Sequence, residues 1–183
     1  MFNTWEWIRI CGFLAYFYFT VSVIFGLFRK SPSITKQKNL LFHLHLSAGW
    51  LGLLALIMHV LLLLIDHYQP YSIIEILVPF TAKYKPLLSA IGTISLYVFL
   101  VVIMTSDLLI RKMNRQLWKS IHFLVLPAWV MIFLHGVFIG TDSANPIIQL
   151  FYIVTGSIII IASCLRVYGT YTKATAASLS KKE

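Results

Sequence analysis

The stretch Leu40–Ile65, LLFHLHLSAGWLGLLALIMHVLLLLI, decides the fold class of this chain. It contains no Asp, Glu, Lys or Arg, and an apolar run of about 18 or more residues is long enough to cross a bilayer as a helix. Four further segments are similarly apolar and carry few charges: Trp7–Phe28, Pro86–Ile110, Trp118–Ile139 and Pro146–Val167. We therefore predict an all-α membrane protein, a bundle of five transmembrane helices.

The composition supports a single membrane domain over residues 1–183. The chain is 59% hydrophobic and 11% charged, whereas roughly a quarter of the residues of a soluble domain are charged. The predicted spans use most of the chain, and a nucleotide- or flavin-binding module would need on the order of 100 residues. We expect no such module, and we expect residues 173–183 to form a frayed cytoplasmic tail.

The formal net charge of +9 is distributed unevenly along the chain. Most basic residues fall on alternate connections, in three groups: Arg29, Lys30, Lys36 and Lys38; Arg111, Lys112, Arg115 and Lys119; and Arg166, Lys173, Lys181 and Lys182. This is the positive-inside pattern of multi-pass proteins, which places the N-terminus outside and the C-terminus in the cytoplasm. The pattern indicates a protein of the cell membrane, which we interpret as a bacterial plasma membrane. It also favours the lipid bilayer, and not nucleic acid, as the partner of the basic residues. The alternative is a docking surface for an acidic cytoplasmic partner.

Four histidines lie inside two of the predicted spans at nearly matched spacing. Thirteen residues separate His45 from His59, and twelve separate His122 from His135. A histidine within a membrane is costly and usually functional, and imidazole is a common axial ligand of haem iron. Both helices run in the same direction and hold their histidines roughly 20 Å apart along the axis, within a hydrocarbon core about 30 Å thick. The pattern predicts two bis-histidine haem b groups, one near each membrane face.

The helical phase of the four histidines fits this prediction only in part. On an ideal helix His59 lies about 40° from His45 around the axis, which is the same face, but His135 lies about 140° from His122. Pro127 lies between the latter two and cannot donate a backbone hydrogen bond. We expect a kink or a local change of winding there.

Other readings of the histidines stay open. His43 faces nearly away from His45 and is expected to hydrogen-bond at the interface or to substitute as a ligand. His67 is expected to be an interfacial side chain or to meet a substrate. Zinc is disfavoured, because no His-Glu-x-x-His run is present and the spans hold few acids. A haem-free scaffold or assembly factor, with histidines in helix packing, and a small transporter remain as alternatives.

The residues from Leu41 to Asp142 resemble the ferric-reductase-like transmembrane family. That family includes ferric reductases, the membrane core of NADPH oxidases and the haem subunit of a bacterial methionine sulfoxide reductase system. The resemblance rests on several short motifs: the His45-x13-His59 pair, Leu-Gly-Leu-Leu-Ala around Gly52, Ile91-Gly-Thr-Ile-Ser-Leu-Tyr97, Thr105-Ser106, Trp118-Lys-Ser-Ile-His122, Leu134-His135-Gly136 and Gly140-Thr-Asp142.

This resemblance implies a role for each of the four histidines. His45 and His122 would ligate the iron of an inner haem, and His59 and His135 that of an outer haem. The family moves electrons from a cytoplasmic flavin or NAD(P)H donor to an acceptor outside, such as ferric iron, oxygen or a periplasm-like oxidoreductase. Because we find no fused flavin domain, the expected electron donor is a separate flavin reductase or membrane quinol. We therefore expect an electron-transfer, oxidoreductase subunit with no catalytic acid, base or nucleophile.

Overall fold

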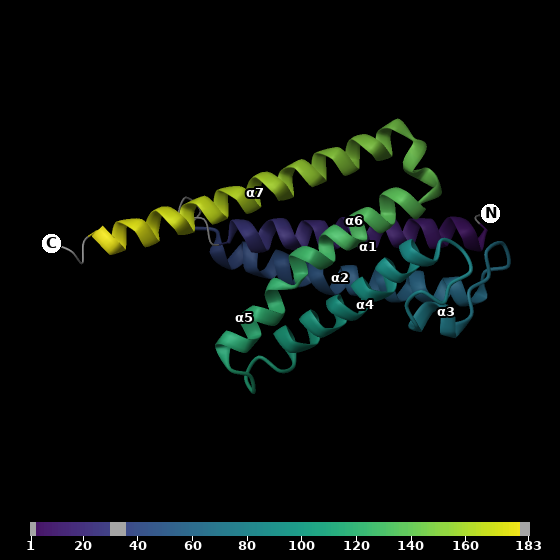
Figure 1. Cartoon of the computed structure of the whole chain (residues 1–183), viewed down its shortest axis with the longest axis horizontal. Coiled ribbons are helices and arrows are strands. Elements are labelled where there is room, and N and C mark those ends of the chain that lie inside the picture. The colour runs from purple at the N-terminus through teal and green to yellow at the C-terminus, as the bar shows by residue number, and fades with distance from the viewer. Residues whose placement is uncertain (1–2, 30–35, 180–183) are drawn as a thin grey trace.

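The computed structural model of the chain describes residues 3–29 and 36–179. Its elements run, in chain order, α1 (Thr4–Phe28), α2 (Lys38–Ile65), α3 (Ile73–Leu77), α4 (Pro86–Asp107), α5 (Arg115–Phe123), α6 (Val125–Ile139), η1 (Thr141–Ala144) and α7 (Pro146–Leu179). Figure 1 shows α1, α2, α4 and α6 side by side, with α7 running back along them. Helix α3 lies at one end of this bundle and α5 at the other. We call these the α3 end and the α5 end.

Within the described residues the chain is all-helical, and five helical segments are long and apolar enough to cross a membrane. The predicted fold class and number of spans are thus confirmed. The fifth helix is longer than predicted, because α7 continues to Leu179. It therefore extends into the segment expected to fray, and residues 180–183 of that segment lie outside the described residues.

The fourth span is two helices where the sequence predicted one. Helix α5 ends at Phe123 and α6 begins at Val125. Pro127 has no N–H to donate to the Phe123 carbonyl four residues earlier, so the ladder of helical hydrogen bonds lacks one bond at this point. The chain turns there, with the Leu124 N–H bonded to Ile121 O at 3.0 Å. The expected break between His122 and His135 therefore exists.

Local capping residues define where several helices begin. At the start of α1 the Asn3 side chain accepts the Glu6 N–H at 2.9 Å, and Glu6 Oε2 accepts the Asn3 N–H at 3.0 Å. At the start of α7 the Asn145 side chain accepts the Ile147 N–H through its Oδ1 at 2.9 Å. Side chains that satisfy the free N–H groups of a first turn stabilise the start of a helix. These signals are local, so the sequence alone indicates them.

The core contains large aromatic side chains and hydroxyl groups. Helix α1 packs extensively along α2, and α4 along α6. In the centre, Phe19 of α1 stacks on Phe99 of α4 with ring centroids 3.9 Å apart and planes at 10°. Beside them, Trp129 Nε1 of α6 donates to the Thr20 hydroxyl of α1 at 2.9 Å. Hydrogen bonds of this kind between helices help to hold a bundle together in lipid, where apolar burial gives little preference for helix contact.

Candidate functional site

His59 and His135 line one large cavity toward the α3 end of the bundle. The cavity has a volume of about 520 Å³ and is mainly apolar, with aliphatic and aromatic side chains from α1, α2, α4 and α6. Ile76 and Glu75 of α3 also line it, so this short helix covers part of the cavity. Cofactor sites commonly have volumes of about 300–1,000 Å³ and such apolar walls.

His59 is held by helix α1 through a main-chain carbonyl. Its Nδ1 lies 2.9 Å from Ile8 O. Gly12, one turn further along α1, leaves space for the imidazole, because a Cβ on Gly12 would lie 3.0 Å from His59 Nδ1. A helical carbonyl already accepts one N–H, but it has two lone pairs and can take a second donor. The glycine makes this second acceptor site accessible to the histidine.

His135 is held by helix α4 through the same arrangement. Its Nδ1 lies 2.8 Å from Leu88 O. Gly92 follows Leu88 by one turn, and a Cβ there would lie 2.6 Å from His135 Cε1. The histidine of α6 therefore packs into a notch of α4 that only glycine can form.

His45 and His122 face each other near the α5 end. Their ring centroids are 6.0 Å apart and the ring planes are at 73°. His45 Nδ1 lies 2.8 Å from Ser22 O, and a Cβ on Gly26 would lie 3.2 Å from His45 Nδ1. A pocket of about 60 Å³ lies beside this pair. Across the break at Leu124, His122 of α5 lines this pocket with His45, while His135 of α6 lines the large cavity with His59.

His122 has a side-chain partner on α4. Its Nδ1 lies 3.0 Å from Ser106 Oγ. The indole of Trp118 stacks on the imidazole with ring centroids 5.1 Å apart and planes at 26°. Trp118 Nε1 also donates to Ser106 Oγ at 3.2 Å.

The hydrogen bonds determine the protonation of three imidazoles. A carbonyl oxygen accepts only, so His45, His59 and His135 must each carry a hydrogen on Nδ1. In the neutral ring Nε2 then keeps its lone pair, which is the form that binds a metal. Among the described residues no group of three or more His, Cys, Asp and Glu could hold a metal ion. A histidine pair on either side of one iron needs no third protein donor.

The two sites are separated by the stacked aromatic pair of the core. Phe19 lines both the cavity of about 520 Å³ and the pocket of about 60 Å³, while Phe99 lines the smaller one. Both side chains are almost completely buried. Packed aromatic rings therefore occupy the space between the histidine pairs.

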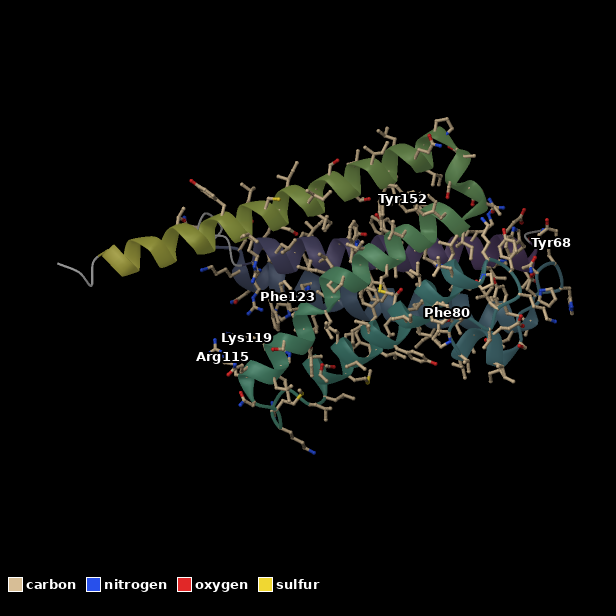
Figure 2. The ribbon with its side chains drawn as sticks, in the orientation of Figure 1. Tyr68, Phe80, Arg115, Lys119, Phe123 and Tyr152 are labelled. Carbon is tan, nitrogen blue, oxygen red and sulfur yellow. The ribbon has the colours of Figure 1, made fainter. Side chains whose placement is uncertain are left out.

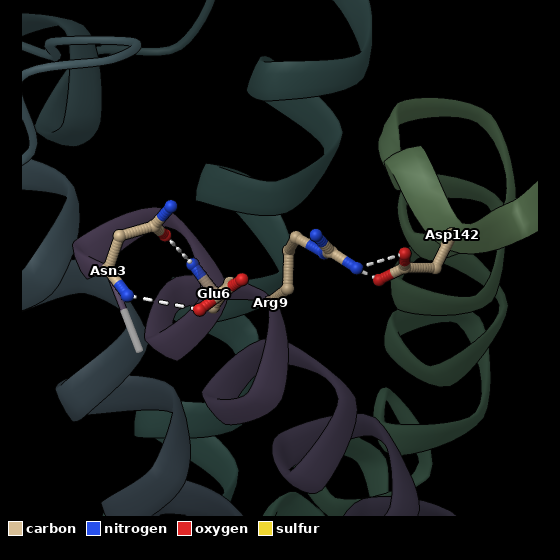
Figure 3. A network of polar contacts seen from close by, with 4 residues as sticks. All are labelled: Asn3, Glu6, Arg9 and Asp142. Atoms are coloured by element: carbon tan, nitrogen blue, oxygen red, sulfur yellow. Dashed lines mark hydrogen bonds and ion pairs between the residues drawn. The ribbon is translucent and has the colours of Figure 1, made fainter. Parts of the chain in front are cut away.

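Charged side chains lie at the α3 end of the large cavity. Arg9 of α1 and Asp142 of η1 both line it, and they form an ion pair in which Arg9 Nε lies 2.6 Å from Asp142 Oδ2. Figure 3 shows this pair next to the Asn3–Glu6 cap of α1. The main-chain N–H groups of Ser72 and Lys83 lower the pKa of Glu75 to about 2, so this carboxylate is charged at neutral pH.

Sequence reasoning missed Gly12 and Gly26 and did not connect Gly92 and Ser106 with the histidines, although a signal for these contacts exists. Gly12 and Gly26 are fourteen positions apart on α1, as are His45 and His59 on the antiparallel α2. Gly92 and Ser106 on α4 are also fourteen positions apart, one more than His122 and His135, which they contact. Small residues at the spacing of the histidines on the neighbouring helix would have identified these contacts. The acceptor carbonyls of Ile8, Ser22 and Leu88 carry no such signal.

The two remaining histidines lie apart from these pairs. His43 is exposed, with its ring centroid 5.8 Å from that of Phe42. His67 is exposed beyond the end of α2. Neither lines the cavity beside His59 and His135 or the pocket beside His45 and His122.

Comparison with known proteins identifies the family of this bundle. Curated proteins and solved structures gave no match. The family model described as ferric reductase like transmembrane component matches residues 11–134. His45, His59 and His122 fall within the matched residues and His135 follows directly, and the resemblance inferred from the motifs is confirmed. With most of its length matched, the chain belongs to the ferric reductase like transmembrane component family and has a role in membrane electron transfer.

Proposed function

We propose that this protein is a di-haem, b-type membrane cytochrome that passes single electrons across the bilayer. His45 and His122 hold one haem, and His59 and His135 hold the other. The observation that carries the proposal is the anchoring of all four Nδ1 atoms to neighbouring helices. A metal-ligating histidine usually has such a partner, which orients the ring and raises its basicity.

The ring separation of His45 and His122, and the volume of the cavity lined by His59 and His135, support this assignment. Two imidazoles that bind one metal ion from opposite sides, each about 2.0 Å from it, have ring centres about 6 Å apart, as His45 and His122 do. The cavity between His59 and His135 has the volume of a cofactor site. At the smaller pocket the flanking side chains would have to turn aside to admit a macrocycle.

The histidines, the apolar walls and the aromatic pair of the core have separate roles in this electron transfer. When bound, each haem would supply a one-electron ferric/ferrous couple whose potential depends on its ligands and on burial. The four histidines would hold the two irons at different depths, and the apolar walls of α1, α2, α4 and α6 would exclude water. Phe19 and Phe99 fill the space between the sites without a polar group.

The distribution of charge supports an orientation of the bundle in the membrane. Most described basic residues lie at the α5 end, where Figure 2 shows Arg115 and Lys119 projecting from the bundle: Arg29, Lys36, Lys38, Arg111, Lys112, Arg115, Lys119 and Arg166. By the positive-inside rule this end faces the cytoplasm and the N-terminus lies outside. His45 and His122 then hold the inner haem, in a bacterial plasma membrane.

With this orientation, the electron donor and the electron acceptor lie at opposite ends of the bundle. We infer that electrons enter at the α5 end from a separate cytoplasmic flavin reductase or from membrane quinol. They leave at the α3 end to an external acceptor, for which ferric iron, oxygen and a periplasm-like oxidoreductase are the candidates. The chain acts as the membrane subunit of this oxidoreductase system.

A pyridine-haemochrome assay on detergent-purified protein, quantified per chain, tests the proposal. We expect two b-type haems in the wild type. His59→Ala or His135→Ala should remove the outer haem, and His45→Ala or His122→Ala the inner one. The matched control is His43→Ala, which should retain both haems because His43 lies outside the two sites.

Three results would contradict the assignment in different ways. Two haems per chain in His135→Ala would exclude this residue as a ligand. Loss of a haem in His43→Ala would mean that His43, and not His45, is the inner ligand on α2. Absence of a Soret band in wild-type protein expressed with haem precursor would indicate a haem-free scaffold, assembly factor or transporter.

A further inference from the structure

The hydrogen bond on Nδ1 distinguishes His122 from the three other histidines. His45, His59 and His135 each donate Nδ1–H to a main-chain carbonyl at 2.8–2.9 Å. His122 Nδ1 instead lies 3.0 Å from the Ser106 hydroxyl. A hydroxyl can donate or accept and is a weaker acceptor than a peptide carbonyl. It is also a side chain, so mutation can change it.

Trp118 orients this hydroxyl. Its indole N–H can only donate, and it donates to Ser106 Oγ at 3.2 Å. One lone pair of the Ser106 oxygen is thereby engaged, and a second remains for His122 Nδ1–H. The indole ring also stacks on the His122 imidazole, which restricts its rotation. Trp118 on α5 and Ser106 on α4 thus hold His122 from two sides.

We propose that Ser106 and Trp118 are positioning residues that set the ligand strength and ring orientation of His122, and thereby the reduction potential of the inner haem. This inference rests on the proposed di-haem function. An imidazole whose Nδ1–H is bonded to a strong acceptor donates more electron density to iron, and this favours the ferric state. Because the Ser106 hydroxyl is a weaker acceptor, it increases the electron donation of His122 to iron less than a carbonyl increases that of the three other ligands.

Ser22 offers a matched control at the same haem. Its hydroxyl also lies 3.0 Å from His45 Nδ1. However, Ser22 O accepts from His45 Nδ1 at 2.8 Å, and the hydroxyl donates to His45 O at 2.9 Å. Ser22→Ala leaves the main-chain acceptor in place. Removing the Ser22 hydroxyl should therefore change His45 little.

The test is a potentiometric titration of the purified holoprotein, followed in the visible bands, in which two haems give two one-electron waves. Ser106→Ala should raise the midpoint potential of one wave by about 59 mV, which corresponds to a tenfold change in the equilibrium constant of a one-electron reduction. The other wave should stay unchanged. Trp118→Phe, which keeps an aromatic ring but lacks the N–H, should shift the same wave upward by less. Ser22→Ala should leave both waves in place.

Electron paramagnetic resonance supplies a second readout. The g anisotropy of a low-spin ferric bis-imidazole site depends on the angle between the two ring planes, which is 73° for His45 and His122. Ser106→Ala should change the signal of this haem because it releases the His122 ring. A side chain that only supported the fold would leave this signal unaltered in protein that retains both haems.

The outcomes separate this inference from the proposed function. Two haems with unshifted waves in both Ser106→Ala and Trp118→Phe would overturn the inference and leave the di-haem assignment intact. If Ser106→Ala loses a haem, Trp118→Phe decides: a shifted wave supports the inference and an unshifted one overturns it. Wild-type protein without haem would overturn the proposed function itself.

Discussion

Gly92→Ala introduces a methyl group where His135 packs against α4. The added Cβ would lie 2.6 Å from His135 Cε1 and 2.8 Å from Nδ1. Ordinary van der Waals contacts begin at 3.4 Å, so the ring must move by the better part of an ångström. An unattached side chain would turn away, but His135 is held to Leu88 O at 2.8 Å. The substitution therefore forces the imidazole out of its ligand position.

The expected loss of haem affinity in Gly92→Ala follows from the cost of the steric overlap. Overfilling a close-packed site costs about 1–3 kcal/mol. Because movement of His135 relieves this strain, the loss should appear in the affinity of the outer site for haem, as a decrease of roughly 5- to 150-fold. The inner pair lies toward the other end of the bundle and should be unaffected.

A graded series of glycine variants provides the assay and its control. The added Cβ would lie 3.0 Å from His59 Nδ1 in Gly12→Ala, and 3.2 Å from His45 Nδ1 in Gly26→Ala. In Gly156→Ala it would lie 3.5 Å from the nearest atom of Phe133, an ordinary contact. Haemin titration of each apoprotein should give the largest loss of affinity for Gly92→Ala, smaller losses for Gly12→Ala and Gly26→Ala, and none for Gly156→Ala.

The series can refute the reasoning. Native haem affinity and two haems per chain in Gly92→Ala would mean that His135 does not occupy this notch when it binds iron. An equal loss in Gly156→Ala would assign the effect to general perturbation of the bundle. Alanine exceeds glycine in helix propensity by about 1 kcal/mol, so a stabilised Gly156→Ala is consistent with the reasoning.

Three further predictions concern the stability of the bundle. The pKa of Glu75 is lowered from 4.5 to about 2, so the support that it gives to α3 is complete above pH 4.5 and disappears as the pH falls toward 2. Glu75→Gln should remove this pH dependence of the protection of the α3 amides, measured as their exchange rates relative to those of the unfolded chain at each pH; an unchanged profile would exclude Glu75 as its source. The Arg9–Asp142 pair is 37% and 40% exposed, so a double-mutant cycle with Arg9→Gln and Asp142→Asn should give a coupling energy of about 0.2–1 kcal/mol, and zero coupling would contradict a direct pairing. Trp129→Phe loses its hydrogen bond to Thr20 and should lower the free energy of unfolding in detergent by about 0.6 kcal/mol, whereas a gain in stability would refute that contribution.

The membrane spans and the break in the fourth one were predictable because both depend on short stretches of chain. Apolar length identifies a span such as Leu40–Ile65 whatever its neighbours are. Pro127 interrupts the helix through its own missing N–H, which separates α5 from α6. The cap at Asn145 is likewise a contact with the residues that follow it.

The arrangement of the candidate site was predictable only in outline. The sequence alone determined that His45, His59, His122 and His135 lie in two apolar spans at nearly matched spacing. Only the tertiary structure decided that α1 and α4 supply their Nδ1 partners and that Ser106 takes the place of a carbonyl at His122. Every residue carries the same main-chain carbonyl, so the sequence does not indicate which carbonyl accepts a hydrogen bond from a histidine. Helix packing alone brings one of them, beside a small residue, within reach of an imidazole.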